Sequence, residues 1–438
     1  MIYIALIILV LCLIVGVPVP ISFMASGAWL IFFGGIDGTG YPASQLLPYG
    51  YKQMDSVPLI AIALFIAAGG IMERGKIGEK LIDFVDVFVG DLKGGLGIVA
   101  TISCAIVGSI CGAACATLSC VGTIVFPRFK AEGYPRGLSA ALLANASLLG
   151  LLIPPNATLI IFAWITGLPV LACFLATVIP GLMVIIMLCV VNRWLLRKNT
   201  TVVVAKKRTG SQKIELLRKR TKTALPSLML PFIVLGGIYG GFMTTTEASA
   251  MAVLYAIPIG IFVYKALSLK GTYEALVESA ITTGVIMVML YSVAMLSRLY
   301  LLENLPEVLL GIFQAVSNNP LVIMFMINIF LVIMGMLMDD ISVVVLATPI
   351  LMPIVLHLGF NPIHFAAIIG VNTGLGCITP PAAPVLYLAG RLGSAPIDEM
   401  MKPCLWFITL CWIPILALVV FFPKISLLLP HMFLGTAW

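Results

Sequence analysis

Residues 147–155 read Ser-Leu-Leu-Gly-Leu-Leu-Ile-Pro-Pro, and residues 373–381 read Thr-Gly-Leu-Gly-Cys-Ile-Thr-Pro-Pro. The two stretches lie 226 positions apart (373 − 147 = 226) and share a glycine at the fourth position and a terminal pair of prolines. Further coincidences at this spacing are Pro127 with Pro353, Gly133 with Gly359, and Gly167 with Gly393. The chain therefore consists of two homologous halves, at about 1–200 and 224–438.

The composition is that of a membrane protein. Of the 438 residues, 61% are hydrophobic and only 10% are charged, whereas soluble domains carry about 25% charged residues. This balance excludes a soluble enzyme, a nucleic-acid-binding protein and a disordered chain. The apolar stretches are continuous and do not alternate, which excludes a β-barrel. The sequence predicts an all-α polytopic membrane protein.

The positive charge is concentrated in one segment. Between Arg193 and Lys222, eleven Lys and Arg residues accompany a single acid, Glu215, so this segment carries +10 and the rest of the chain 7 − 10 = −3. The positive-inside rule makes residues 197–223 a cytoplasmic loop. Contact of the segment with anionic lipids is a secondary interpretation.

The remaining positive charges change sides between the two halves. Four basic residues lie between positions 74 and 93, but the equivalent segment 303–319 has none. Conversely, residues 137–192 are uncharged, whereas their equivalents include Arg391 and Lys402. An inverted-topology repeat predicts this exchange, and a parallel repeat does not. Counting spans from the cytoplasmic loop places both termini on the periplasmic side.

Hydrophobic length defines the expected elements. Segments 95–108 and 113–127 are each shorter than the ~20 residues of a full span, so together they form a re-entrant helical hairpin. Amphipathic helices near 77–92 and 305–317 should lie flat at the membrane interface. The expected spans are 2–16, 19–34, 57–73, 137–166, 170–196, 224–243, 246–264, 273–302, 362–391 and 403–422, with a second hairpin at 320–356.

These elements divide the chain into a frame and a transport block. Scaffold spans and an interfacial arm helix occupy 1–94, and the first hairpin and broken helix occupy 95–169. Scaffold spans, the cytoplasmic loop and a second arm helix follow at 170–319. The second hairpin and broken helix occupy 320–402, and a C-terminal span and tail occupy 403–438.

The hairpin tips and the broken helices carry the expected chemistry. The tips are placed at Gly108–Gly112 and Gly335–Asp340, and the breaks at Pro154-Pro155-Asn156 and Thr379-Pro380-Pro381. A helix interrupted inside a membrane exposes free carbonyls, which suit Na⁺, and free amides, which suit an anion. Ordinary proline kinks are the alternative. Two breaks at equivalent positions, each paired with a glycine-rich tip, favour a transport site.

Two symmetry-related Na⁺ sites follow from this placement, with the substrate between them. The ligands expected at the first tip and break are Gly108, Ser109, Gly150, Ile153 and Asn156. Those expected at the second are Gly335, Gly376, Thr379 and Ala382. The residues expected to contact the substrate are Ser147, Asn156, Asn372 and Thr373. No catalytic residue and no organic cofactor are predicted, because the chain contains no enzyme or cofactor motif.

The acids of the second tip need a separate interpretation. Intramembrane acids are costly and usually functional. Capping of the second hairpin helix by Asp339 or Asp340 is favoured over direct ligation of an ion. The reason is that the equivalent positions of the first tip are Ala113 and Ala114, so the shared mechanism requires no charge there.

Three further polar residues are expected to be structural. Glu247 follows Thr244 at the spacing of a capping box. His357 and His364 lie beside the outer end of the second hairpin, where a surface position is favoured over a role in proton transfer.

Several stretches resemble the signatures of one transporter family. Residues 150–167 (Gly-Leu-Leu-Ile-Pro-Pro-Asn-Ala-Thr-Leu-Ile-Ile-Phe-Ala-Trp-Ile-Thr-Gly), 240–250, 335–339 and 371–381 are similar to the large membrane subunit of tripartite ATP-independent periplasmic (TRAP) transporters. The resemblance implies an elevator-type, Na⁺-driven carrier in a bacterial or archaeal cytoplasmic membrane. It also implies two partners: a small four-helix membrane subunit and a periplasmic binding protein that delivers an organic acid. A stand-alone Na⁺/organic anion symporter of similar architecture is the alternative.

Overall fold

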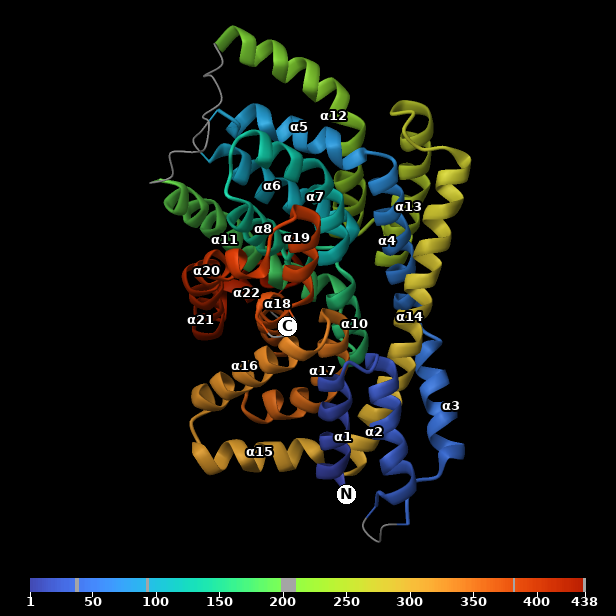
Figure 1. Cartoon of the computed structure of the whole chain (residues 1–438). Coiled ribbons are helices and arrows are strands. Elements are labelled where there is room, and N and C mark those ends of the chain that lie inside the picture. Colours follow the sequence, from blue (N-terminus) through green and yellow to red (C-terminus); the bar gives the residue numbers. More distant parts are fainter. Residues whose placement is uncertain (36–38, 92–93, 198–209, 381–382, 436–438) are drawn as a thin grey trace.

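The computed structural model describes residues 1–35, 39–91, 94–197, 210–380 and 383–435, and these residues form helices and connecting turns without any strand (Figure 1). The α-helices are α1 (Ile2–Val15), α2 (Val19–Phe33), α3 (Ala43–Met54), α4 (Val57–Arg74), α5 (Ile77–Val89), α6 (Gly95–Cys111), α7 (Ala114–Ala131), α8 (Arg136–Ser147), α9 (Leu149–Leu152), α10 (Ala157–Thr166), α11 (Val170–Leu196), α12 (Gly210–Tyr239), α13 (Thr245–Pro258), α14 (Leu269–Leu302), α15 (Leu305–Val316), α16 (Pro320–Leu337), α17 (Asp340–His357), α18 (Pro362–Ile378), α19 (Pro384–Gly393), α20 (Ile397–Phe407), α21 (Ile413–Phe421) and α22 (Lys424–Leu434). Short π-helical segments cover Ile259–Val263 and Ile408–Trp412.

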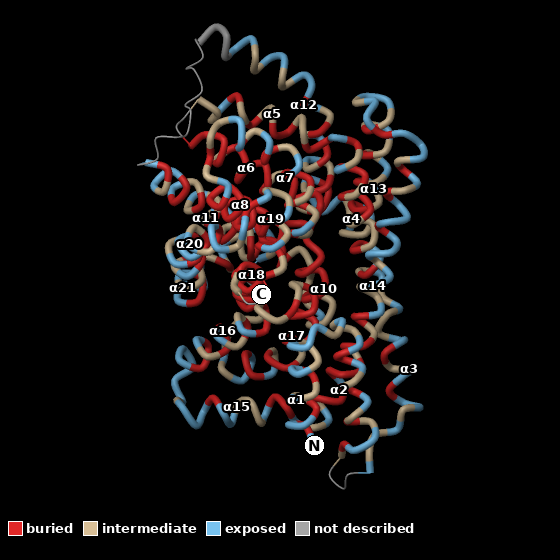
Figure 2. Tube along the Cα trace, viewed as in Figure 1, coloured by how far each residue is buried: buried red, intermediate tan, exposed pale blue. Residues whose placement is uncertain are grey.

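The helices confirm the polytopic all-α fold class. Nine helices of the described part of the chain are long and apolar enough to cross a membrane. The hairpin helix α6 and the interrupted pieces α9 and α10 are shorter than a full span, as the sequence predicts. Buried residues gather around α6, α8 and α18, at the centre of the molecule (Figure 2).

The two halves repeat helix by helix. The second arm of the first hairpin, α7, and that of the second, α17, begin and end 226 positions apart (340 − 114 and 357 − 131). The amphipathic helices α5 and α15 are equivalent in the same way, yet they lie at opposite ends of the molecule (Figure 1). Equivalent elements at opposite ends are the geometry of an inverted repeat, which the distribution of charge predicts.

The helix equivalent to α14 is divided in the first half, which the sequence did not reveal. There, α3 and α4 together cover the positions of α14 (43 + 226 = 269), and α3 was not expected as a helix. Pro58, in the first turn of α4, lacks the amide hydrogen that a continuous helix would use. Gly284 stands at the equivalent position of α14 (58 + 226 = 284), so that helix continues.

Two expectations need correction, one for the basic segment and one for the C-terminal region. Residues 210–223 belong to α12, which runs on to Tyr239, and are not a loop; residues 198–209 lie outside the described residues. The Gln, Glu, Leu, Lys and Arg residues of 210–223 favour a helix. The charges of this segment therefore exclude a membrane span but do not exclude a helix. The last span begins at Ile397 and not at 403, and the tail contains an eleven-residue helix, α22, that is too short to predict as a span.

The amphipathic helix α5 docks through one face. Leu81 and Val85 are buried, whereas Phe88 is 51% exposed. On the polar face, Asp83 pairs with Arg128 of α7 at 2.8 Å, and Asp86 pairs with Arg220 of α12 at 2.5 Å. The expected apolar face of α5 is therefore confirmed at its buried residues. Ion pairs connect the polar face of α5 to the first hairpin and to the basic segment.

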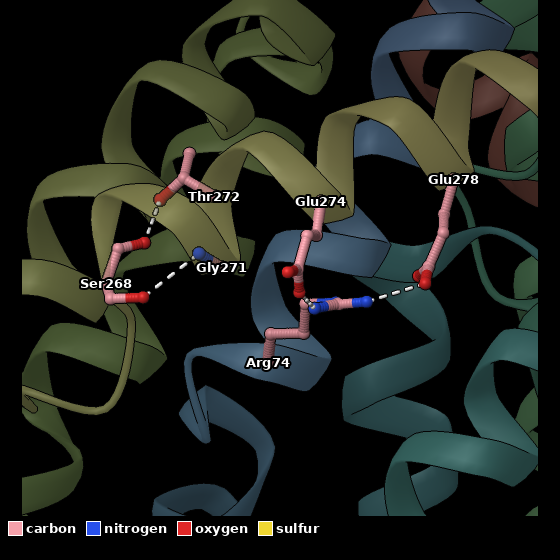
Figure 3. Close-up of polar contacts among 6 residues, drawn as sticks. All are labelled: Arg74, Ser268, Gly271, Thr272, Glu274 and Glu278. Atoms are coloured by element: carbon pink, nitrogen blue, oxygen red, sulfur yellow. Dashed lines mark hydrogen bonds and ion pairs between the residues drawn. The ribbon is translucent and has the colours of Figure 1, made fainter.

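Ion pairs also connect the two halves of the chain, between α4 of the first half and α14 of the second half. Arg74, at the end of α4, pairs with Glu274 and Glu278 of α14 at 2.8 and 2.6 Å (Figure 3). The start of α14 is capped by Ser268, whose hydroxyl accepts a hydrogen bond from the Gly271 amide at 3.0 Å (Figure 3). Exposed ion pairs contribute only about 0–1 kcal/mol each, so the apolar packing of α4 on α13 and α14 carries most of this association.

Candidate ion and substrate site

The first hairpin turns against the first break. α6 ends at Cys111, and Gly112 reverses the chain with a φ of 64°, a left-handed conformation that glycine adopts without strain. The Gly112 carbonyl accepts a hydrogen bond from the Ala157 amide at 3.2 Å. The tip thus touches the first amide of α10, the helix that restarts after the break.

Glycine makes a close backbone approach possible at this place. A Cβ atom added to Gly108 would lie 2.6 Å from the Cα of Gly150, and one added to Gly150 would lie 2.8 Å from the Thr117 hydroxyl. Real Cβ atoms essentially never come within 3.0 Å of another heavy atom. The hairpin and the broken helix therefore meet backbone to backbone, which brings together the predicted ligands Gly108 and Gly150.

The second half repeats this contact. A Cβ on Gly335 would lie 2.8 Å from the Cα of Gly376, and one on Gly376 would lie 2.6 Å from the Cα of Gly335. Gly376 is the repeat partner of Gly150, whereas Gly335 is displaced by one residue from the partner of Gly108 (335 − 226 = 109). Both predicted pairs of tip and break are therefore in contact.

Asn156 spans the first break. Its side-chain N–H donates to the Leu151 carbonyl at 2.7 Å, and its side-chain oxygen accepts from the Leu159 amide at 2.7 Å. It is fully buried and forms the N-cap of α10. Asn156 thus satisfies one group on each side of the interruption. Its repeat partner, Ala382, lies outside the described residues.

The other expected side-chain ligands donate to their own helices. Ser109 donates to the Ile106 carbonyl at 2.7 Å, and Thr379 donates to the Leu375 carbonyl at 2.6 Å. A hydroxyl that donates to a carbonyl keeps its oxygen lone pairs for a cation. Ile153 caps α9 in an extended conformation at the break. Their roles as Na⁺ ligands stay predictions.

Ser147 and Thr373 lie beside the axis that relates the halves. A Cβ on Gly374 would lie 3.9 Å from the Cβ of Leu148, its own repeat partner, and a residue that meets its partner must lie near the symmetry axis. The Ser147 hydroxyl donates to Ala144 at 2.8 Å and the Thr373 hydroxyl to Ile369 at 2.6 Å. Both residues are fully buried. The two breaks therefore converge at the centre of the fold.

Asn372 carries a buried polar atom without a partner. Its side-chain N–H₂ donates to Asn328 at 2.6 Å and to the Ile368 carbonyl at 2.9 Å. Its side-chain oxygen is buried and finds no hydrogen-bond partner among the described residues. Such an oxygen, one turn before Gly376, suits a cation or a polar substrate group.

The structure also brings together residues that the sequence analysis missed. The Thr158 hydroxyl, in the first turn of α10, donates to the Asp340 carboxylate at 3.1 Å. This contact joins the first broken helix to the tip of the second hairpin. Cys115, at the start of α7, is exposed and lies within electrostatic range of Asp340. The signal available for Thr158 was a hydroxyl placed directly after a break.

The capping expectation is confirmed for Asp339. Its carboxylate accepts from the Ser342 amide at 3.3 Å and also contacts the Ser342 hydroxyl. Asp340 instead faces Thr158. The second tip thus divides its two acids between a helix cap and the interface between the halves.

We expect Asp339→Ala to lower the free energy of unfolding by about 0.5–2 kcal/mol through loss of the cap. Asp339→Asn should retain most of the stability, because Asn is an equally good N-cap. Thermal unfolding of the purified variants measures the effect. If both substitutions also raised the Na⁺ concentration needed for half-maximal uptake, Asp339 would be an ion ligand and not only a cap.

Of the three further polar residues, two lie as the sequence predicts and one does not. Thr244 and Glu247 form the predicted capping box of α13, and His357 is exposed. The surface position expected for His364 is wrong. His364 is 1% exposed, and its Nδ1 lies 2.6 Å from the Ser426 hydroxyl. Ser426 belongs to α22, the helix that the sequence analysis missed, and this helix covers the histidine.

Inverted repeats whose hairpin tips meet interrupted helices define a secondary membrane transporter. A family model described as "Tripartite ATP-independent periplasmic transporter, DctM component" matches residues 6–425. The chain belongs to this family and is a large permease subunit of a TRAP transporter. It is not an enzyme.

The relatives and one solved structure agree with this assignment. The chain is 31% identical to the sialic acid TRAP transporter large permease protein SiaM of Vibrio cholerae, over 96% of each chain. It is also 31% identical to the isethionate TRAP transporter permease protein DctMQ of Oleidesulfovibrio alaskensis; the match covers 95% of this chain but only 64% of that relative's length. The crystal structure of the YdaH transporter of Alcanivorax borkumensis superposes with a TM-score of 0.62 at 13% identity, over 96% of this chain and 99% of that one, which shows a shared fold.

Proposed function

We propose that this permease subunit carries a small organic acid into the cell by Na⁺-coupled symport, with an elevator movement of the hairpins and broken helices. The observation that carries the proposal is the pair of glycine contacts, Gly108 with Gly150 and Gly335 with Gly376. Each contact places the last turn of a hairpin helix against the end of an interrupted helix. The carbonyls at such ends lack partners within their helices, so each contact can supply several oxygen atoms to one ion.

The substrate site is proposed between the two ion sites, near the four residues expected from the sequence: Ser147, Asn156, Asn372 and Thr373. The Thr158–Asp340 contact and the exposed thiol of Cys115 lie where the two halves meet. The relatives named above are named for isethionate and sialic acid, which are both organic acids. The substrate is therefore proposed to be an organic acid, with its carboxylate near these residues.

Asp340 supplies a physical reason for coupling. Like charges a few ångströms apart repel in a site of low dielectric constant, so the carboxylate of Asp340 opposes the binding of an acid. A bound Na⁺ offsets this repulsion and orders the tips. Because linkage is reciprocal, the acid then raises the affinity for Na⁺ by the same factor.

The proposed movement follows from the division of the chain into hairpins, broken helices and spans, and the proposed partners follow from membership of the TRAP transporter family. The block is formed by 95–169 and 320–402, and the other helices form the frame. The partners are a small four-helix membrane subunit and a periplasmic binding protein that delivers the acid. The membrane is the cytoplasmic membrane of a bacterium or an archaeon.

Uptake into proteoliposomes tests the function. The protein is reconstituted with its small subunit and the binding protein, and uptake of a panel of organic acids is measured with and without an inward Na⁺ gradient. Accumulation that requires the gradient supports the proposal, and equal uptake without Na⁺ would overturn the coupling. Full activity of the purified permease alone would instead favour a stand-alone Na⁺/organic anion symporter.

The orientation is tested with reporter fusions. A reporter at Gly210 should be cytoplasmic and one at the C-terminus periplasmic, because the basic segment between α11 and α12 obeys the positive-inside rule. Paired alkaline phosphatase and fluorescent-protein fusions measure both positions. A cytoplasmic reading at the C-terminus would contradict the proposed count of spans.

A further inference from the structure

A cavity with a partly polar wall lies between the frame and the block. It has a volume of about 190 Å³ and is lined by α3 and α14 on one side and by α10 and α17 on the other. A single water needs ~15 Å³ of such space, so the cavity has room for a small polar group. Within this set, α14 packs against α3 and α17, and α17 packs against α10.

Arg298 is the one charged residue among the described residues that line this cavity. Its guanidinium carbon lies 5.6 Å from the centroid of the Tyr49 ring. Stacking uses the flat face of the guanidinium and leaves the N–H groups at its edge free. Arginine binds carboxylates through these N–H groups, often with two parallel hydrogen bonds. Arg298 is an exposed residue and thus has N–H donors available for an acid group.

No acid of the described chain neutralises Arg298 in an ion pair. The nearest acid along α14 is Glu303, five residues further on. Its carboxylate is occupied by the Gly35 amide at 2.7 Å and the Tyr41 hydroxyl at 3.0 Å. Burial and the contact with Glu303 raise the pKa of Tyr41 to about 12, so Tyr41 remains a donor at neutral pH.

Ser297 is a second polar residue of the cavity wall. The residue is only 8% exposed, and its hydroxyl oxygen is buried. This hydroxyl finds no hydrogen-bond partner among the described residues. Buried hydroxyls are normally satisfied. Arg298 therefore offers an unpaired cation to the cavity, next to the buried hydroxyl of Ser297.

Two helices of the cavity wall, α10 and α17, also carry Thr158 and Asp340. Val345 of its wall is five residues beyond Asp340 on α17, which is ~7–8 Å along a helix. Trp164 is six residues beyond Thr158 on α10, or ~9 Å. A group bound at Arg298 is therefore about two helical turns or less from the proposed substrate site, on the side toward α3.

We propose that Arg298 forms an anion-capture site that holds the acid group of the substrate before it reaches Thr158 and Asp340. The inference rests on the proposed function for the identity of the anion, an organic acid. Because α3 and α14 belong to the frame while α10 and α17 belong to the block, the site is complete only in the arrangement that the structure shows. Arg298 is thus placed to select acids and to load the block.

Thiol labelling tests the charge of the cavity without a known substrate. Gln53→Cys places a thiol in its wall, and peptide mass spectrometry follows its reaction with 2-sulfonatoethyl and 2-trimethylammonioethyl methanethiosulfonate. The anionic reagent should be favoured, and Arg298→Gln should lower the ratio of the two rates by about tenfold or more. Lys270→Gln is the matched control, because it removes the same charge from an exposed position near the other end of α14 and should leave the ratio unchanged.

Uptake then tests whether the captured anion is the substrate. Arg298→Gln should raise the KM for the acid about 10- to 100-fold while the maximal rate changes little, since a hydrogen bond to a charged group is lost. Ser297→Ala should raise KM less, and Arg298→Lys should keep the labelling ratio but not the low KM. Labelling that ignores Arg298, or a KM that is unchanged in Arg298→Gln, would overturn the inference. A wild type without Na⁺-dependent uptake would overturn the proposed function, while the labelling ratio would still decide whether the cavity attracts anions.

Discussion

Cross-linking Met289→Cys to Ser342→Cys with a short bifunctional thiol reagent is expected to abolish uptake. The Ser342 hydroxyl, in the first turn of α17, contacts the Met289 sulfur of α14 at 2.8 Å. This contact joins the tip of the second hairpin to the frame. If the hairpins travel across the membrane as part of a moving block, a covalent link at this point stops every transport cycle. Initial rates of uptake in proteoliposomes, before and after cross-linking, measure the effect.

The matched control is a link within the frame. A Cβ added to Gly70 of α4 would lie 3.1 Å from the Ser279 hydroxyl of α14, so the pair Gly70→Cys and Ser279→Cys reacts with the same reagent without reaching a hairpin. That variant should retain uptake after cross-linking. Because the chain has ten native cysteines, both pairs are built in a cysteine-free background whose uptake is measured first. Undiminished uptake in the linked Met289–Ser342 protein would rule out the elevator movement.

Gly376→Val is expected to raise the Na⁺ concentration for half-maximal uptake by about 5- to 150-fold. Its Cβ would lie 2.6 Å from the Cα of Gly335, where the neighbour is backbone and cannot rotate away. Overpacking of this kind typically costs about 1–3 kcal/mol, which corresponds to that range of equilibrium constants. The valine separates the broken helix from the hairpin and moves the proposed carbonyl ligands apart. Uptake measured against Na⁺ concentration at saturating substrate gives the shift.

Gly311→Val is the matched control, because a Cβ at Gly311 of α15 meets no atom within 4 Å. It should leave the Na⁺ dependence unchanged. Gly150→Val should behave like Gly376→Val if the two halves hold equivalent ions, since its Cβ would lie 2.8 Å from the Thr117 hydroxyl. Folding of each variant is checked by size-exclusion chromatography. A folded Gly376→Val protein with wild-type Na⁺ dependence would contradict the placement of the second ion.

The sequence predicts the repeat, the hairpins and the breaks because each depends on local chemistry. Glycine and proline weaken a helix through local backbone chemistry, and a stretch too short to span a bilayer is visible by counting. The breaks at Ile153–Asn156 and at Thr379 lie where the double prolines indicate them. Asp339 and Glu247 cap helices as their spacing predicts.

The elements that the sequence analysis missed are those whose stability depends on contacts. α3 and α22 are short amphipathic or mixed helices with no full-length hydrophobic span. α22 buries His364, whose position next to a surface turn suggested exposure. A short helix is marginal by itself and is stabilised by packing on its neighbours, so periodicity within the segment is a weak signal.

By itself, the sequence determined where the two broken helices are interrupted at the double prolines and that this arrangement occurs twice, in opposite orientations. Only the tertiary structure decided which residues from different halves meet: Thr158 with Asp340 at 3.1 Å, and Tyr49 with Arg298 in the wall of one cavity. Interruptions of a helix depend on local glycine and proline residues, so they can be predicted from the order of the residues. A contact between residues 182 positions apart depends instead on how whole helices pack, and the spacing of residues along the chain contains no direct record of that packing.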